Sequence, residues 1–260
     1  MQHDDKDTDK EKTCEVVWGH GMLLEPIART SLWREDDSVL ANYDDNGLFC
    51  GGRQVQWELN GGKCGICGDD YALPRPRPSE LGGMYDFGKV PRKYLQGGQM
   101  PVGVMLTANH LGYFKFALCP VDVWGEESEE CFAAYPLNLT TGEDRLPVPT
   151  SEVGWYNATL QLPEDVTCRH CVVQWTYITG NSWGICPSGE GKLGCGQEQE
   201  NFRTCSDIAI FSKEAHQWWE DIVHAHQAIY PNPEINETQD NEIPEVIEDI
   251  VARFLLKLRH

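Results

Sequence analysis

Eleven cysteines in 260 residues constrain this chain more than any other feature of its sequence. Cysteine at this density is typical of oxidising compartments, where paired thiols become disulfides that hold a core together. Setting aside Cys14, which lies near the start, leaves an even number. We therefore predict a secreted protein with up to five disulfides, drawn from Cys50, Cys64, Cys67, Cys119, Cys131, Cys168, Cys171, Cys186, Cys195 and Cys205. The spacing of the cysteines leaves their pairing open.

Two pairs of cysteines have the CxxC spacing that is also found in zinc and redox sites, Cys64–Cys67 and Cys168–Cys171. A zinc ribbon places its two pairs about 15–20 residues apart, and these two pairs are much farther apart. A thioredoxin-like redox site needs a βαβ setting, of which the sequence gives no sign. Disulfides are the preferred interpretation, and a cysteine-ligated zinc ion is the alternative.

The charge of the chain excludes some partners. It has 41 Asp and Glu against 21 Lys and Arg, for a formal charge of −20. Sequence-independent binding to nucleic acid or to an anionic membrane needs a basic face, so we expect neither. The apolar runs are also too short for a membrane-spanning helix. Three Asn-x-Ser/Thr sequons agree with secretion and predict N-glycosylation at Asn138, Asn157 and Asn236.

The chain divides into three parts by composition. Residues 1–19 alternate acids and lysines, and Val17 and Gly19 suit the positions before a signal-peptidase cut, although the segment lacks the apolar run of a signal peptide. We expect this leader to be removed, and an acidic disordered extension is the alternative. The hydrophobic pattern of residues 214–260 predicts two helices joined by a polar linker. Residues 20–213 hold ten of the eleven cysteines and are rich in Gly, Pro and aromatic residues.

Short strand-like stretches separated by turn clusters recur within residues 20–213. The pattern predicts an all-β fold, an antiparallel β-sandwich of the immunoglobulin or fibronectin-III type with long loops and disulfides. The expected strands cover Val102–Thr107, Tyr113–Cys119, Ala158–Leu162, Val172–Thr179 and Asp207–Phe211.

Two of the eight histidines stand in a context that suggests a metal site, His20 and His110. A lone histidine is ordinarily a surface residue or a hydrogen-bonded core residue and not a metal ligand. If cleavage exposes His20, however, its α-amine and its imidazole can chelate one ion, and His110 can supply a third nitrogen. Three nitrogen ligands suit copper, which binds most tightly among the divalent metals of the first transition row.

The same region resembles the auxiliary activity family 15 lytic polysaccharide monooxygenases, copper enzymes of insects and other invertebrates. The resemblance runs in family order across nearly all of residues 20–213. It is carried by HGMLLEPIARTSLWR (20–34), NGLFCGG (46–52), NGGKCGICGD (60–69), PRPSELGGMY (76–85), TANHLGYFKFALCP (107–120), CVVQWTYITGNSWGIC (171–186) and FRTCSDIAI (202–210).

The resemblance implies that His20 and His110 form a histidine brace around one copper ion. It places Phe202 at the axial position, where phenylalanine shields the metal and cannot ligate it, and Ala108 on the other axial side. Gln174 is a candidate for an amide that positions the oxygen species. Strand alternation puts Trp175 on the opposite face of its strand from Gln174, in the core.

The reaction that the resemblance implies is oxidative cleavage of chitin, with cellulose as the alternative substrate, at C1. It needs an external reductant and hydrogen peroxide or dioxygen, and we expect a monomer that acts on the crystalline polysaccharide. Two alternatives stay open. A non-catalytic chitin- or copper-binding module would bind without forming oxidised products, and a structural matrix protein would lack a tight copper site.

Overall fold

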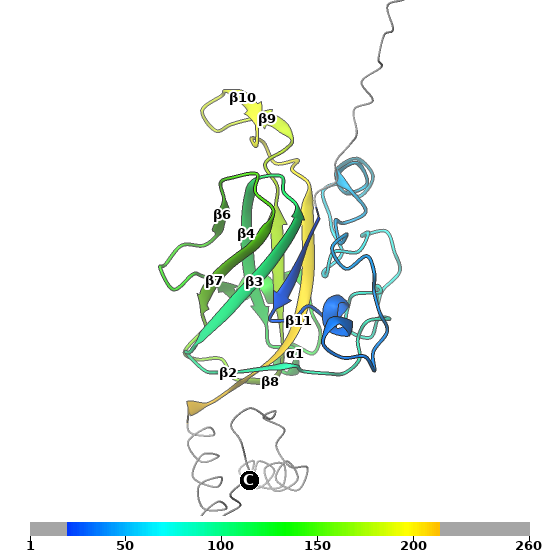
Figure 1. The fold of residues 1–260 in the computed structure, drawn as a ribbon, viewed down its shortest axis with the longest axis vertical. Helices are drawn as coiled ribbons and strands as arrows, with labels where there is room; N and C mark the ends of the chain where they lie inside the picture. Colours follow the sequence, from blue (N-terminus) through cyan, green and yellow to red (C-terminus); the bar gives the residue numbers. More distant parts are fainter. Residues whose placement is uncertain (1–19, 214–260) are drawn as a thin grey trace, which may run out of the picture. The chain divides into compact units, whose positions relative to one another are not determined.

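A computed structural model describes residues 20–213, which lie within one of the two compact units of the chain, Met1–His216. This part is mostly β-strand. The first sheet is antiparallel, with the strand order β1-β3-β7. Its strands are β1 (His20–Glu25), β3 (Gln99–Ala108) and β7 (Gly154–Gln161). Figure 1 shows this sheet lying against a second, larger one.

The second sheet has the strand order β2-β11-β8-β4-β5, and β6 also pairs with β4. Strand β2 runs parallel to β11, and the other pairings are antiparallel. Its strands are β2 (Arg92–Leu95), β4 (Gly112–Cys119), β5 (Pro136–Leu137), β6 (Leu146–Val148), β8 (Cys168–Ile178) and β11 (Asn201–Phe211). The prediction of a disulfide-stapled, all-β sandwich is confirmed.

The main core lies between the two sheets and is rich in aromatic rings. Trp175 and Tyr177 of β8 are fully buried there, together with Phe114 and Phe202. The Phe114 ring meets the rings of Trp175 and Tyr177 edge to face, with centroids 5.3 and 5.0 Å apart. Each such pair contributes about 0.5–1.5 kcal/mol beyond the burial of its area. The predicted burial of Trp175 is confirmed.

The other face of β8 is covered as well, which explains why this strand does not alternate between apolar and polar residues. Val172 packs there in a second cluster with Ile66, Val121 and Phe132. Val121 belongs to α1 (Val121–Trp124) and Phe132 to α2 (Glu129–Ala134). Strand β8, the middle strand of the second sheet, therefore has both faces covered.

All ten cysteines between positions 50 and 205 form disulfides, as predicted. Only one CxxC pair bonds within itself, Cys168–Cys171. Cys64 and Cys67, the other CxxC pair, bond to more distant partners. The remaining bonds are Cys50–Cys64, Cys67–Cys205, Cys119–Cys131 and Cys186–Cys195.

The five predicted strands coincide with or overlap β3, β4, β7, β8 and β11, while several shorter elements were not expected. Among them are the 3-10 helix η1 (Arg29–Arg34), the π-helix η2 (Val55–Leu59) and the hairpin of β9 (Trp183–Ile185) and β10 (Gly191–Leu193). Cys14 and the two helices predicted beyond position 213 lie outside the described residues. Within residues 20–213, no helix is long and apolar enough to cross a bilayer.

Candidate metal centre

Strand pairing brings the two histidines to the same end of the first sheet. Strand β1 begins at His20, which lies opposite Ala108, the last residue of β3. His110 follows two positions later, just beyond that strand. The hydroxyl of Thr107 donates a hydrogen bond to the His20 carbonyl at 3.4 Å and accepts one from the Asn46 amide at 3.0 Å. The pairing therefore unites residues that are 90 positions apart in the chain.

The turn that carries the second histidine depends on glycine and asparagine. Gly112 has a φ of 97°, and a Cβ at this position would lie 2.0 Å from the carbonyl oxygen of Ile178. Only glycine fits there. The Asn109 side chain accepts a hydrogen bond from the Leu111 N–H at 2.7 Å and donates one to the Tyr156 hydroxyl at 2.8 Å. These contacts tie the turn to β7.

The backbone of His110 is held on both sides. Its N–H donates to the Tyr177 hydroxyl oxygen at 3.0 Å, and its carbonyl accepts from the Gly180 N–H at 2.8 Å. Burial raises the pKa of Tyr177, so the phenol stays neutral. The position of this histidine is therefore set by β8 and by the residues that come directly after that strand.

The imidazole of His110 is oriented through its Nδ1 atom. That nitrogen lies 2.6 Å from the Asn181 amide and 3.4 Å from a carboxylate oxygen of the buried Glu200. A carboxylate only accepts hydrogen bonds, so the tautomer with a proton on Nδ1 fits. A half-turn of the Asn181 amide then lets its oxygen accept from Nδ1 while its nitrogen faces the Thr179 hydroxyl, 2.7 Å from the amide. The lone pair on Nε2 is left to bind a metal.

Two of the other predicted site residues lie close to this arrangement. Ala108 is the residue opposite His20. Phe202 is fully buried in β11 opposite Tyr177, and the two rings stack with centroids 5.7 Å apart. Because the same tyrosine holds the His110 backbone, Phe202 belongs to the layer of side chains that supports the second histidine.

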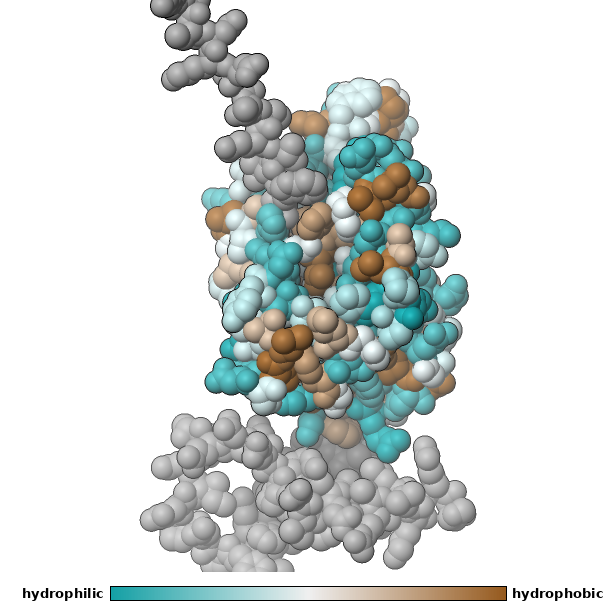
Figure 2. Space-filling view, turned by 90° about the vertical axis from the view of Figure 1, so that its right-hand side faces the viewer, coloured by the Kyte–Doolittle hydropathy of each residue, from teal (hydrophilic) through white to brown (hydrophobic). Residues whose placement is uncertain are grey.

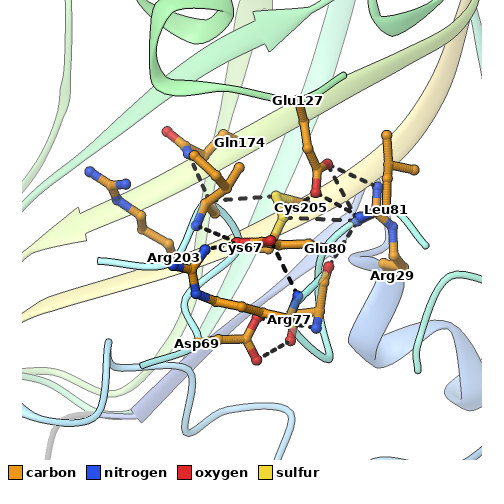
Figure 3. Close-up of a disulfide and its surroundings, with 12 residues drawn as sticks. Arg29, Cys67, Asp69, Arg77, Glu80, Leu81, Glu127, Gln174, Arg203 and Cys205 are labelled. Carbon is orange, nitrogen blue, oxygen red and sulfur yellow. Dashed lines mark hydrogen bonds and ion pairs between the residues drawn. A yellow bond between two sulfur atoms is a disulfide. The ribbon is translucent and has the colours of Figure 1, made fainter. Parts of the chain in front are cut away.

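The structure does not bring Gln174 to the histidines, so we correct that assignment. Gln174 is three residues before Tyr177 in β8, and positions an odd number apart face opposite sides of a strand. Its amide donates a hydrogen bond to the carbonyl of Ile66 at 2.8 Å. Figure 3 shows it beside the Cys67–Cys205 disulfide, whose cysteines belong to the second hydrophobic cluster.

The polar residues that do contact His110 were not predicted from the sequence. Asn181 lies within one of the matching motifs but has no feature of its own that marks it. Glu200 is one of 41 acids and precedes the last motif by two positions. Tyr177 reads as an ordinary core aromatic. Their relation to the histidine comes from contacts in the folded chain, of Asn181 and Glu200 with Nδ1 and of Tyr177 with the backbone N–H.

A second group of metal-ligating residue types does not form a metal site. Ligand atoms of Cys67, Glu127 and Cys205 lie within 4.8 Å of one another. The two cysteines are bonded to each other, so neither offers a thiolate. The Glu127 carboxylate accepts from the Leu81 N–H at 2.7 Å and pairs with Arg29 at 3.4 Å. This cluster is a structural ion pair beside a disulfide.

The hairpin of β9 and β10 begins two residues after Asn181 and extends beyond the end of the sandwich where β1 starts (Figure 1). Three large apolar side chains of the hairpin are exposed: Trp183 and Leu193 are each 65% exposed, and Ile185 is 55% exposed. The Cys186–Cys195 disulfide closes it. On the side of the molecule seen in Figure 2, hydrophobic residues form small separate groups among hydrophilic ones.

The fold and the site together define a disulfide-stapled β-sandwich protein with two histidines presented at one end of a strand pair. Comparison with known families matches residues 20–208 to the family described as "Lytic polysaccharide mono-oxygenase, cellulose-degrading". The chain belongs to the lytic polysaccharide monooxygenases, and the auxiliary activity family 15 assignment made from the motifs is confirmed. No curated protein matches the sequence.

Among solved structures, the chain is similar to an AA15 lytic polysaccharide monooxygenase from Thermobia domestica in the Cu(I) state. The identity is 46%, the match covers 74% of this chain and 99% of that one, and the TM-score is 0.71. Two distant structures are an AA10 enzyme from Streptomyces lividans (13% identity, 73% and 99% covered, TM-score 0.42) and a chitin-binding domain from Burkholderia pseudomallei (11%, 75% and 100%, 0.41). Neither of these two likenesses is close enough to indicate the function of this chain.

Proposed function

We propose that this protein is a secreted, copper-dependent monooxygenase that cleaves chitin, and secondarily cellulose, by oxidation at C1. In this proposal residues 1–19 are removed, residues 20–213 form the catalytic domain and residues 214–260 are an extension outside it. The observation that carries the proposal is the placement of His20 opposite Ala108, with His110 two positions beyond and its Nδ1 already engaged. This arrangement leaves nitrogen ligands for a metal at one end of the sandwich.

The donor set suits copper. Cleavage before His20 would add an α-amine to two imidazoles, and an all-nitrogen set of this kind is typical of copper sites. The similar Thermobia domestica enzyme was solved in the Cu(I) state. When bound, copper supplies the activation of hydrogen peroxide or dioxygen that hydroxylates a C–H bond beside the glycosidic link, which then breaks.

The chain positions the ligands and shapes their surroundings. Tyr177 and Gly180 fix the His110 backbone, and Glu200 favours the tautomer with a proton on Nδ1, whose Nε2 lone pair would bind the ion. A carboxylate beside the ring nitrogen also makes the imidazole a stronger donor. Phe202 contributes an apolar ring on which no ligand atom is available, and Ala108 leaves room next to His20 because its side chain is a single methyl group.

The substrate must meet the site on a surface, because a crystalline polysaccharide cannot enter a deep pocket. The β9–β10 hairpin begins two residues after Asn181, which contacts His110, and it supplies exposed apolar side chains, with Trp183 the largest. A tryptophan ring can pack against the C–H face of a sugar. Chitin and cellulose both present such faces, and the family description names cellulose. The experiment therefore includes both polymers.

The test uses protein whose first residue is His20, loaded with one equivalent of copper. It is incubated with chitin or cellulose, a reductant and peroxide, and the soluble products are analysed by mass spectrometry. We expect oligosaccharides with aldonic acid ends from chitin, absent without copper. His110→Ala, and a version that keeps residues 1–19 and so lacks the free α-amine, should both lose tight copper binding by calorimetry and electron paramagnetic resonance.

Two results would contradict the proposal. Unchanged copper affinity in His110→Ala would show that His110 is not a copper ligand and would contradict the proposed metal site. Copper binding and chitin binding without oxidised products from either polymer would favour the alternative, a secreted binding module of the same fold.

A further inference from the structure

We infer that Asn157 carries an N-linked glycan whose first sugar packs against the indole of Trp155. Asn157 begins the sequon Asn157-Ala158-Thr159 in β7, and its side chain is exposed. The inference depends on the secretory route but on no catalytic step, so it holds or fails independently of the monooxygenase activity.

The geometry of the sheet brings the two side chains together. Trp155 and Asn157 are two positions apart in β7, so both side chains leave the same face of the sheet about 7 Å apart. Gly103 of β3 is the register partner of Asn157. A Cβ added at Gly103 would lie 3.2 Å from the Asn157 Oδ1 atom and 3.2 Å from the Trp155 Cζ3 atom. The amide and the indole therefore converge over a residue that has no side chain.

The chemistry of both groups fits an attached sugar. The Trp155 side chain is 55% exposed, which leaves a broad apolar ring in water. Within residues 20–213 the structure gives the Asn157 amide no hydrogen bond, so its nitrogen is available for the link. In the transfer, this nitrogen bonds to C1 of a lipid-diphosphate-linked oligosaccharide, the bond from C1 to the phosphate oxygen breaks, and the amide loses one proton. The C–H face of the new pyranose then covers the indole.

The sequon at Asn138 is a natural control within the same chain. It is also exposed, but the residue two positions before it is Pro136 and not an aromatic. The third sequon, at Asn236, lies outside the described residues.

The location of Asn157 also fits a bulky modification. Its partner Gly103 is five positions before Ala108, which corresponds to about 17 Å along β3. A glycan there stays clear of the histidine end of the sheet. Strand β7 is the last strand of the first sheet, and a glycan on it would hinder pairing with a strand of another molecule.

The experiment starts with the chain secreted from insect cells and analysed by glycopeptide mass spectrometry, where we expect Asn157 to be occupied. The glycan is then trimmed to a single N-acetylglucosamine in an Asn138→Gln background. Four proteins are compared by thermal unfolding: Asn157 or Asn157→Gln, each with Trp155 or with Trp155→Ala. We expect the sugar to raise Tm by about 2–4 °C when Trp155 is present and to have no effect in Trp155→Ala.

Each contrary outcome overturns one part of the inference. If Asn157 is unmodified in the wild-type chain while Asn138 is modified, the inferred glycan at Asn157 is wrong. An equal rise in Tm with and without the indole would show that the sugar does not pack against Trp155. Because Trp155 is exposed, its replacement should not impair folding. Gly103→Ala provides a second variant, in which the added Cβ displaces the indole or the amide and should reduce the rise in Tm.

Discussion

The backbone N–H of His110 donates a hydrogen bond to the hydroxyl oxygen of Tyr177, 3.0 Å away, so a core residue fixes the position of a ligand candidate at the end of the sandwich. Tyr177 is fully buried and stacks on Trp175 and Phe202. The buried aromatic core therefore restrains the backbone of the second histidine through this hydrogen bond.

Tyr177→Phe tests this connection. The change keeps the ring but leaves the His110 N–H without its acceptor, which should cost about 1–3 kcal/mol of unfolding free energy in chemical denaturation. Copper affinity should fall about tenfold in a chelator competition. Tyr94→Phe is the control, because this half-buried tyrosine bonds to Glu25 in another part of the sandwich. Equal copper affinities in both variants would show that Tyr177 has only a packing role.

Glu200→Gln should weaken copper binding by about 10- to 100-fold, because it removes a carboxylate charge 3.4 Å from the Nδ1 atom of His110. Isothermal titration measures the affinity directly. Glu198→Gln is the matched control, since that acid is two-thirds exposed and pairs with Arg53. If the two variants bind copper alike, Glu200 does not tune the imidazole.

Trp183→Ala should reduce the fraction of protein that sediments with insoluble chitin several-fold, with copper affinity unchanged. The reason is the loss of an exposed ring from the hairpin next to the histidine site. Trp124→Ala is the control, because Trp124 is also exposed but lies in α1, toward the opposite end of the sandwich in Figure 1. A similar loss of binding in both variants would point to non-specific adsorption through exposed tryptophans.

His170 should make stability depend on pH. Its Nε2 atom lies 2.8 Å from the Asp207 carboxylate, and this hydrogen bond raises the pKa of His170 above its ordinary value, although burial acts in the opposite direction. A raised pKa means that the contribution to stability is fully present below about pH 6.5 and is lost as the pH rises through the folded-state pKa. Thermal unfolding from pH 5.5 to 9 measures this loss.

The comparison for His170 is His170→Gln, which should show a smaller fall in Tm over the same pH range. The variant is needed because the large negative charge of the chain also changes stability with pH. Parallel curves for the two proteins would mean that the pair with Asp207 contributes nothing to folding.

The sequence predicted the parts of the fold that depend on local pattern. The alternating direction of side chains along a strand correctly placed Trp175 in the core, and the cysteine count correctly indicated disulfides. Disulfide pairing could not be predicted, because Cys67 and Cys205 are 138 positions apart and meet only through the packing of a loop on the second sheet.

The site was predictable only in part, for a related reason. His20 and His110 stand in recognisable motifs, whereas the role of Glu200 depends on its distance to one ring nitrogen. Gln174 was assigned wrongly. It lies an odd number of positions from Tyr177 in β8 and so faces the other side of the strand, and both faces of that strand are buried. Where both faces are covered, polarity along the strand no longer tells which side a residue occupies.

The turn at His110 is anchored by its main chain, through Tyr177 on one side and Gly180 on the other. The neighbouring surface side chain, Leu111, is 40% exposed and takes no part in this anchoring. A substitution at an exposed position such as Leu111 can therefore change the surface beside the histidine without altering the backbone position of His110. The architecture separates the buried contacts that hold His110 in place from the exposed side chain that follows it.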